Sequence, residues 1–430
     1  DLEGIPVDFY EFRYAQLEVV EGRQKHLEYY WTNRDKDIWH ILLNTLTQGI
    51  NQDGCGLAND PCGTLDYAFQ QISIERVGNV NYYVGEKKIG ICKGGYYLSN
   101  PIQFYQYTCK TSSIKIMKEN YGTDQAMDGN AQLLIKKEDQ TSKDYSSNGW
   151  MYLDESMKLG LYGIDIITDQ SVLNTSVIYI YGYSSTLILD TVTFIGFELS
   201  PYYTSNTIAI IYCQYQNSRV TAQNCVFEDI NIEGQGGSAI YLMKYPWGSD
   251  STITATITEC KFKNINIKGD NEERGGAAIF AEIYDGSSVK VIGPSSEFTQ
   301  CFVQSGNGGS IYAKLDKTGL FQIDGDVLFK QCEAIKDISN KGGRGGSIYL
   351  SLTSDSTYNF YIGDQSRFDS NKADLWGRDV FIYCQSIFTL NALQHFLFDI
   401  FPPSYNQDNA LYGTEQESIT GNIEDLLVDY

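Results

Sequence analysis

The feature that most constrains the fold is a repeat in the second half of the sequence. Each copy has a Gly-Gly pair, one or two small residues, an isoleucine and an aromatic residue; copies begin at Gly236, Gly275, Gly308 and Gly345, with a variant at Gly377. A phenylalanine precedes each copy, and one unit of this size cannot bury its own apolar face, so neighbouring units are expected to cover one another. The phenylalanines of the series lie 31 to 39 residues apart: Phe194, Phe227, Phe262, Phe298, Phe329 and Phe368.

Each unit contains short runs of residues that favour strands. Thr252–Thr258 alternates threonine with isoleucine or alanine, and Ile265–Ile267 and Ala278–Ala281 are shorter still. Such runs are too short for ordinary helices and are typical of β-strands. The predicted fold is therefore all-β: a single-stranded, right-handed parallel β-helix (a solenoid), in which three short strands and three turns make one coil.

Stacked coils lead to specific expectations. Coils in parallel register lie about 4.8 Å apart, so Phe227 is expected to stack on Phe262 and the six phenylalanines to form a core ladder. The Gly-Gly pairs are expected at a corner where the backbone needs a positive φ or where a β-carbon would clash. The insertion Lys268–Arg274 is expected to protrude at that corner.

The repeat divides the chain into three predicted regions. Residues 51–395 are expected to form the β-helix, with degenerate coils in residues 75–225 and a large polar loop at residues 128–150. Residues 1–50 are expected to be an N-terminal extension and residues 396–430 an extended C-terminal tail. Each terminal segment is expected either to cap the solenoid or to pair with a neighbouring molecule by strand addition.

A short capping helix is predicted near the start of the β-helix. Thr64 is a suitable N-cap residue. Apolar residues follow it at helical spacing, namely Leu65, Ala68, Phe69 and Ile72. A helix here would cover the apolar open end of the first coil and its unpaired strand edges.

Two stretches resemble known families. The block from Asp53 to Phe69, followed by Gly94-Gly95-Tyr96, resembles the N-terminal cap of secreted pectate-lyase-like β-helices. The later repeats resemble those of the chlamydial polymorphic membrane proteins and of similar protist surface proteins, which carry Gly-Gly-Ala-Ile and Phe-x-x-Asn repeats. Gly275–Ile279 matches the first motif and Phe368–Asn371 the second, whereas Phe227 and Phe262 lack the asparagine. The resemblance covers about residues 51–395 and implies a β-helix that serves as an adhesin or surface coat.

Charge and composition narrow the location and the partners. The formal net charge of −22 disfavours nucleic acids and anionic membranes as partners. The sequence has no apolar run long enough for a transmembrane helix, so no membrane insertion is expected. Because the chain begins at Asp1, a signal peptide is expected to have been removed. Asn174-Thr175-Ser176 is a glycosylation sequon, and the chain is predicted to be a secreted glycoprotein of the cell surface.

The ten cysteines are expected to be structural. None forms a Cys-x-x-Cys pair and the three histidines lie far from them in sequence, so neither zinc nor any other metal or cofactor is expected. Their even number favours disulfides in an oxidising compartment, and a buried ladder of free thiols is the alternative. The candidates are the local pairs Cys55–Cys62 and Cys92–Cys109 and the stacked pairs Cys225–Cys260 and Cys301–Cys332.

No catalytic residue is predicted. No histidine occurs between His40 and His395, which excludes a histidine-assisted site across the repeats. The carboxylates of Asp324-Gly325-Asp326 are interpreted as part of a turn and only secondarily as a metal or catalytic pair. The acidic run Asp270–Glu273 is interpreted as a solvated loop, with Ca²⁺ binding as the alternative.

The tyrosines give a weaker functional signal. Tyr179, Tyr181 and Tyr183 alternate, so their rings share one face of a strand. Rings that point inward would belong to the core, whereas rings that point outward could stack on sugars or on another protein.

The predicted function is that of an extracellular structural or adhesive protein and not of an enzyme. A solenoid has two ends, so head-to-tail contacts would build a filament or coat from copies of the chain, or would join other surface proteins. The alternative is a protein that binds or degrades polysaccharides on one solenoid face, as a polysaccharide lyase or glycoside hydrolase would, with glycans as ligands.

Overall fold

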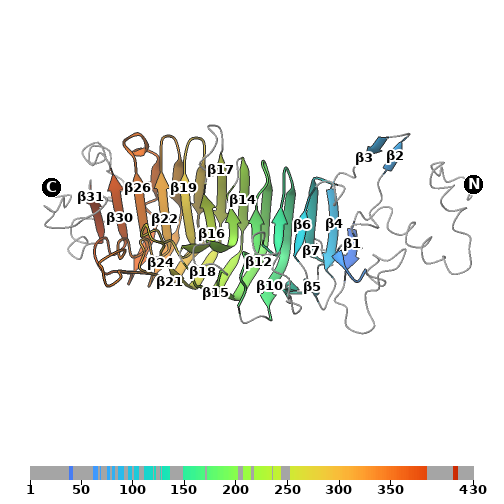
Figure 1. The fold of residues 1–430 in the computed structure, drawn as a ribbon, viewed down its shortest axis with the longest axis horizontal. Coiled ribbons are helices and arrows are strands. Elements are labelled where there is room, and N and C mark those ends of the chain that lie inside the picture. The colour runs from blue at the N-terminus through green and yellow to red at the C-terminus, as the bar shows by residue number, and fades with distance from the viewer. Residues whose placement is uncertain are drawn as a thin grey trace, which may run out of the picture.

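The computed structural model describes the body of the chain and short parts of its ends. The described residues are 38–41, 62–65, 68, 75–77, 80–82, 86–91, 95–98, 101–105, 111–119, 121–122, 126, 128–135, 149–169, 172–201, 207–214, 217–234, 236–243, 252–384 and 410–414. They form a stack of parallel strands that runs along the long axis of the molecule (Figure 1). This arrangement is the predicted all-β parallel solenoid.

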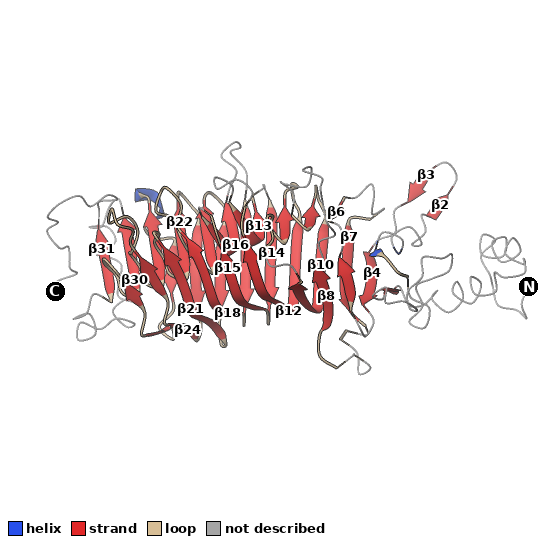
Figure 2. Ribbon diagram, turned by 60° about the horizontal axis from the view of Figure 1, so that its bottom comes forward, coloured by secondary structure: helices blue, strands red, loops and turns tan. Residues whose placement is uncertain are grey.

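The coils present three faces, which we call the first, second and third face. The first two belong to one sheet, because β10 (Lys158–Thr168) and β12 (Thr186–Leu199) run through both of them. The third face is a separate sheet to which each coil contributes one strand. Figure 2 shows that the described body consists mainly of strands joined by loops and turns, with a short 3₁₀ helix, η2 (Ser354–Ser356), near one edge.

The remaining strands fall into these faces by their pairing. On the first face lie β1 (Ile38–Ile41), β4 (Glu86–Ile91), β7 (Ser113–Lys118), β14 (Ser218–Gln223), β17 (Ile253–Thr258), β20 (Ser288–Ile292), β23 (Leu320–Asp324) and β27 (Phe360–Ile362). On the second lie β5 (Tyr96–Leu98), β8 (Ala131–Ile135), β15 (Val226–Ile232), β18 (Lys261–Lys268), β21 (Ser296–Gln304), β24 (Val327–Lys330), β25 (Glu333–Ile335), β28 (Arg367–Asp369) and β29 (Lys372–Ala373).

The third face contains β6 (Ile102–Phe104), β9 (Met151–Leu153), β11 (Ile178–Ile180), β13 (Ile208–Cys213), β16 (Gly237–Met243), β19 (Ile279–Ile283), β22 (Ile311–Leu315), β26 (Ile348–Leu352), β30 (Val380–Cys384) and β31 (Leu411–Thr414). Outside the three faces, β2 (Glu75–Val77) pairs with β3 (Val80–Tyr82) as an antiparallel hairpin.

The predicted phenylalanine ladder is confirmed. Phe227 is the register partner of Phe194 on one side and of Phe262 on the other. The series continues in register to Phe368, with ring centroids 4.8–5.0 Å apart and ring planes within 12° of parallel. Five of the six side chains are fully buried, and Phe368 packs against the same core from a partly exposed position.

A second aromatic ladder was not predicted. It lies on the side of the third face that points away from the main core and forms a hydrophobic cluster of its own. Successive rings from Tyr241 onward are 4.2–5.5 Å apart and no more than 7% exposed: Tyr241, Phe280, Tyr312, Tyr349, Phe381 and Tyr412. From β16 onward, the third face therefore buries aliphatic side chains on its inner side and aromatic rings on its outer side.

The Gly-Gly corners have the predicted geometry. Gly276 has a φ of +80°, and a β-carbon there would lie 2.3 Å from the carbonyl oxygen of Ile279. Gly308, Gly345 and Gly377 take the same left-handed conformation in the following coils. Only glycine meets both conditions at this corner, because other residues pay for a positive φ and also carry a β-carbon.

Three details of the predicted organisation differ from the structure. Strand β8 lies inside residues 128–150, so this stretch is not wholly a polar loop. Strand β1 pairs with β4, and β31 pairs with β30, so the parallel stack extends beyond the predicted limits at residues 51 and 395. Within the ranges that the structure describes, no helix has the length and apolar character needed to cross a bilayer.

Alanine substitutions at two glycines distinguish the steric cost of a β-carbon at the corner from the conformational cost of a positive φ. Gly276→Ala is expected to lower the free energy of unfolding by several kcal/mol. An alanine in the left-handed conformation costs ~1–2 kcal/mol, and the collision of its β-carbon with the backbone adds to this cost. Gly129 also has a positive φ, of +69°, but has open space where the β-carbon would lie. Gly129→Ala should therefore show the conformational cost alone in chemical denaturation, and equal losses for the two variants would contradict the steric role.

Candidate functional site

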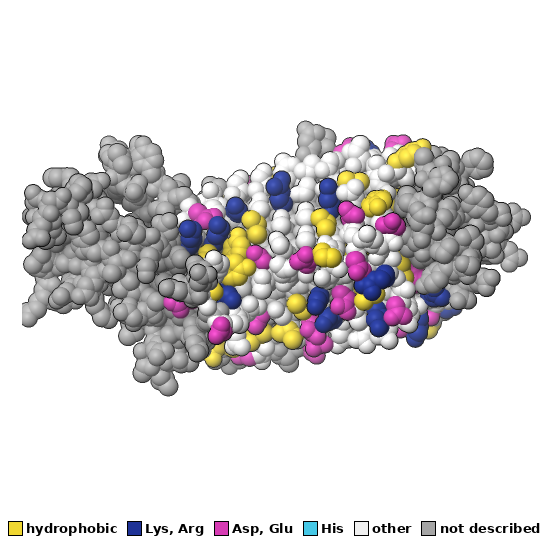
Figure 3. Space-filling view, turned by 180° about the vertical axis from the view of Figure 1, so that it is seen from behind, with side chains coloured by type: hydrophobic (Ala, Val, Ile, Leu, Met, Phe, Trp, Pro, Cys, Tyr) yellow, Lys and Arg dark blue, Asp and Glu magenta, His cyan; other side chains and the backbone are white. Residues whose placement is uncertain are grey.

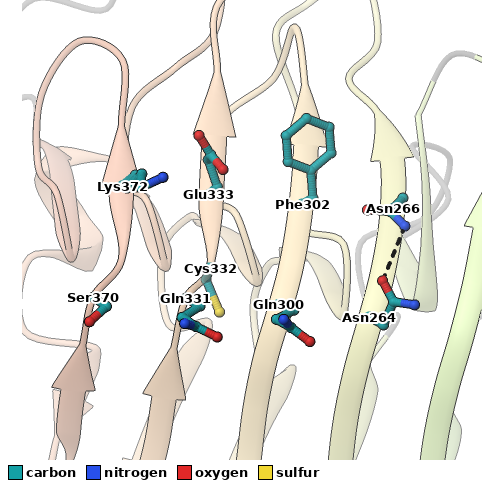
Figure 4. Close-up of a pocket in the computed structure, with 9 residues that line it drawn as sticks. All are labelled: Asn264, Asn266, Gln300, Phe302, Gln331, Cys332, Glu333, Ser370 and Lys372. Atoms are coloured by element: carbon teal, nitrogen blue, oxygen red, sulfur yellow. Dashed lines mark hydrogen bonds between the residues drawn. The ribbon is translucent and has the colours of Figure 1, made fainter.

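A polar groove lies on the second face of the described body (Figure 4). It has a volume of about 390 Å³ and crosses four successive coils, from β18 to β29. Figure 4 shows the lining side chains in two rows that run across the strands. One row holds Asn264, Gln300, Gln331 and Ser370, and the other holds Asn266, Phe302, Glu333 and Lys372.

The groove exists because each strand of the second face bends at a residue in the left-handed conformation. Asn264, Gln300, Gln331 and Ser370 have φ values between +49° and +58°. The bend interrupts the alternation of inward and outward residues, so Lys263 and Asn264 both point outward while Phe262 and Ile265 are buried. Stacking of the same bend in each coil makes a continuous trough.

Four of the nine side chains that line the trough are amides, and two of them hydrogen-bond to each other. Asn264 Nδ2 donates to Asp229 Oδ1 over 2.7 Å, and Asn266 Nδ2 donates to Asn264 Oδ1 over 3.5 Å. An amide offers both donors and acceptors, which suits a ligand with many hydroxyl groups. Phe302 adds a half-buried aromatic ring to the same row as Asn266.

The charges of the groove suit binding better than catalysis. Glu333 and Lys372 are register partners on β25 and β29. Glu333 is the one carboxylate among the residues that line the groove. Glycoside hydrolysis generally uses two carboxyl groups on either side of the scissile bond. The groove thus offers hydrogen bonds and one aromatic contact, without the acid–base pair of that chemistry.

Asp324 and Asp326, the acidic pair considered in the sequence, both make structural contacts. Asp324 Oδ1 accepts a hydrogen bond from the Gly325 amide, and Asp326 forms an ion pair with Arg367, with 2.7 Å between Oδ1 and Nε. The positive φ of Gly325, +75°, agrees with the predicted turn. No group of metal-binding side chains occurs among the residues described.

The acidic insertion is partly held in a network of ion pairs. Arg274 reaches Asp270 over 2.6 Å and Glu282 over 2.9 Å, and its guanidinium lies over the ring of Phe280. Glu273 Oε2 lies 2.7 Å from Nη1 of Arg344, which belongs to a coil further along the chain. Asn271 and Glu272 are exposed, so the interpretation of this run as a solvated loop holds for these two residues and is wrong for Asp270 and Glu273.

The stacked cysteines are not disulfides. Cys225 is aligned with Cys260, and Cys301 with Cys332, as predicted, but all four are buried free thiols. In-register neighbours point the same way with β-carbons about 4.8 Å apart, beyond the roughly 3.5–4.5 Å that a disulfide requires. Cys225 donates its thiol proton to the Gln223 carbonyl, and contact with the Cys260 thiol together with burial raises the pKa of Cys225. The alternative of a buried thiol ladder is therefore confirmed.

The other predicted site residues have mixed outcomes. Cys62 is buried and disulfide-bonded, while Cys55, Cys92 and Cys109 lie outside the described residues. Asn174 is exposed, and the Ser176 hydroxyl of the sequon accepts a hydrogen bond from the Ala209 amide. Tyr181 and Tyr183 point outward and are 39% and 45% exposed, so the core interpretation is wrong for them.

Comparisons with known proteins do not add to this picture. No protein-family model, curated protein or solved structure matches the chain. The resemblance to secreted and surface β-helices stays a prediction from the motifs.

Asn371 and Asp379 form a buried polar pair in the last described coils, whose interior therefore differs from that of the coils before them. Asn371 takes the core position that Cys332 holds one coil earlier, and its Oδ1 accepts a hydrogen bond from the Cys332 amide. Its Nδ2 donates to the Phe329 carbonyl and to Asp379 Oδ1, the latter over 2.8 Å. Burial raises the pKa of the Asp379 carboxyl, although Asn371 and Arg378 oppose the shift. The asparagine of the Phe-x-x-Asn motif thus holds two coils together.

The raised pKa of Asp379 predicts a pH dependence of stability. The folded state binds a proton on this carboxyl more tightly than the unfolded chain does, so its contribution to stability is present at low pH and is lost as the pH rises through the folded pKa. The difference in unfolding free energy between the wild type and Asp379→Asn should therefore shift in favour of the wild type as the pH falls from 7 to 4. A difference that is independent of pH in urea denaturation would contradict the prediction.

Proposed function

We propose that the chain is an extracellular structural or adhesive surface protein, and not an enzyme. The observation that carries this proposal is the uninterrupted in-register stack, whose side chains cover one another coil after coil along a single axis. Such a body is stiff and presents long outward faces, which suits a spacer, coat or adhesin.

Surface location and partners belong to the same proposal. The net charge of −22 favours solubility outside the cell, and the exposed Asn174 is open to glycosylation. The partners proposed are further copies of the chain or other surface proteins. Contacts between solenoid ends would be head-to-tail and would produce linear assemblies.

Surface labelling combined with electron microscopy tests this function. Antibodies against the purified chain should label intact, unpermeabilised cells that produce it, and the full chain at physiological salt should form rods joined end to end. Labelling that appears only after permeabilisation would contradict the proposed location. Single, unjoined particles at all concentrations would contradict the filament.

Glycan binding in the groove is a second candidate function. It is favoured by one observation, the row of amides that lies next to the half-buried ring of Phe302. Aromatic rings pack on the apolar faces of sugars while amides exchange hydrogen bonds with hydroxyls.

A change at Phe302 tests the groove. Phe302→Ala should weaken glycan binding by about tenfold, the loss of one aromatic contact, as measured by titration calorimetry. Thr299→Ala, on the same strand but outside the groove lining, is the matched control. If Phe302→Ala and the wild type have equal affinities for every glycan that binds, glycan binding in the groove is contradicted.

The winding sense and the cap complete the proposed architecture. We propose a right-handed winding, because connections between parallel strands of one sheet are right-handed in nearly all proteins. We also propose the short capping helix after Thr64. It is supported by the hydrogen bond from the Ala68 amide to the Thr64 carbonyl and by the burial of Leu65 and Ala68.

A further inference from the structure

A tyrosine ring reaches over a glycine on the outer surface of the first face. The edge of the Tyr162 ring occupies the space above Gly160, two residues earlier on β10. A β-carbon at Gly160 would lie 2.5 Å from the ring atom Cε2 and 2.8 Å from the hydroxyl oxygen. The ring can take this position because Gly160 has no side chain.

A second glycine admits a second ring. A β-carbon at Gly163 would lie 2.9 Å from both Tyr121 Cδ2 and Lys118 Cδ. The ring centroids of Tyr121 and Tyr162 are 5.6 Å apart and the ring planes are tilted by 47°. Both rings are half-buried, so together they make a shallow aromatic corner that we call the tyrosine platform.

Polar groups of both charges surround the tyrosine platform. Lys115 Nζ lies 5.9 Å from the Tyr162 ring centroid and 2.8 Å from Glu86 Oε1. Lys118 Nζ lies 5.8 Å from the Tyr121 ring centroid and donates to the Gly129 carbonyl over 2.9 Å. Because Glu86 neutralises Lys115, the edge of the platform offers donors and acceptors without a strong net charge.

The neighbouring coil extends the apolar surface. Ile188 is the register partner of Gly160 on the next coil and points outward, half-buried. Figure 3 shows hydrophobic side chains gathered next to lysines on this face, toward the end where the N-terminal coils lie. The strand interior gives up stability for this arrangement, since a central glycine costs roughly 0.5–1 kcal/mol relative to alanine.

We propose that the tyrosine platform binds a neutral hexose unit of a glycan chain. The half-buried ring of Tyr162 offers an aromatic surface for the apolar face of a pyranose, and Tyr121 bounds the sugar on one side. Glu86 and Lys115 can exchange hydrogen bonds with its hydroxyls, as acceptor and donor. The balanced charge selects a neutral sugar over an acidic one. In its ligand class this inference rests on the second proposed function, but it assigns a separate site on a different face.

Gly160→Val is the most direct test, because its side chain fills the space that the Tyr162 ring edge occupies and displaces the ring, while no aromatic residue is removed. Valine favours strands, so the fold is expected to persist, which circular dichroism and thermal melting of the full chain would check. Thr221→Val is the matched control, two coils along the same outward column and away from any ring contact. Tyr162→Ala provides a second variant that removes the ring itself.

Titration calorimetry with a β-1,4-linked glucose hexamer, a mannose hexamer and polygalacturonate gives the outcomes. At least one neutral hexamer should bind the wild type and Thr221→Val equally, and binding should fall about tenfold or more in Gly160→Val and Tyr162→Ala. Binding of polygalacturonate alone would overturn the proposal, as would undiminished binding by a folded Gly160→Val. If binding is lost in Phe302→Ala and kept in Gly160→Val, glycan binding by the groove stands and the tyrosine platform is refuted.

Discussion

Parallel hydrogen bonding between successive coils is the constraint from which the rest of the structure follows. Once the backbone of one coil pairs in register with the next, each inward side chain must lie about 4.8 Å from its counterpart. Flat aromatic rings meet this condition by stacking, as Phe227 and Phe262 do with 4.8 Å between centroids. Thiols such as Cys225 and Cys260 meet it without joining, because the spacing that suits rings is too wide for a disulfide. Each coil is thereby stabilised only by its neighbours, and no single central core is needed.

The same pairing turns local irregularities into extended surface features. One left-handed residue would be a minor bend in an isolated strand, but Asn264, Gln300, Gln331 and Ser370 repeat it in four coils and produce the groove. The tyrosine platform has the opposite origin, because it depends on a departure from repetition at Gly160 and Gly163. A surface feature of a solenoid can thus arise from a bend that successive coils repeat or from a substitution that occurs in one coil alone.

Much of the fold could be predicted from the sequence, because spacing between like residues reports stacking directly. The phenylalanine ladder and the glycine corner were accessible for this reason. The outer ladder was not predicted, although an aromatic residue follows the isoleucine in the copies of the repeat: Tyr241, Phe280, Tyr312 and Tyr349. These residues point outward, and outward residues are normally expected to contact solvent. Strand β8 was missed because the charged residues around it outweighed the alternation in Ala131–Ile135. The groove and the tyrosine platform could not be predicted, since both join residues of different coils whose alignment depends on loop lengths.

The corners between the second and third faces carry a consequence for divergence. Loops there differ in length, as those that follow β18 and β25 do, while the strands on either side keep their register. Insertions at this edge therefore leave the spacing of the groove and of both aromatic ladders unchanged. One margin of the molecule can therefore change in sequence and length during evolution while the contacts that keep the coils folded are preserved.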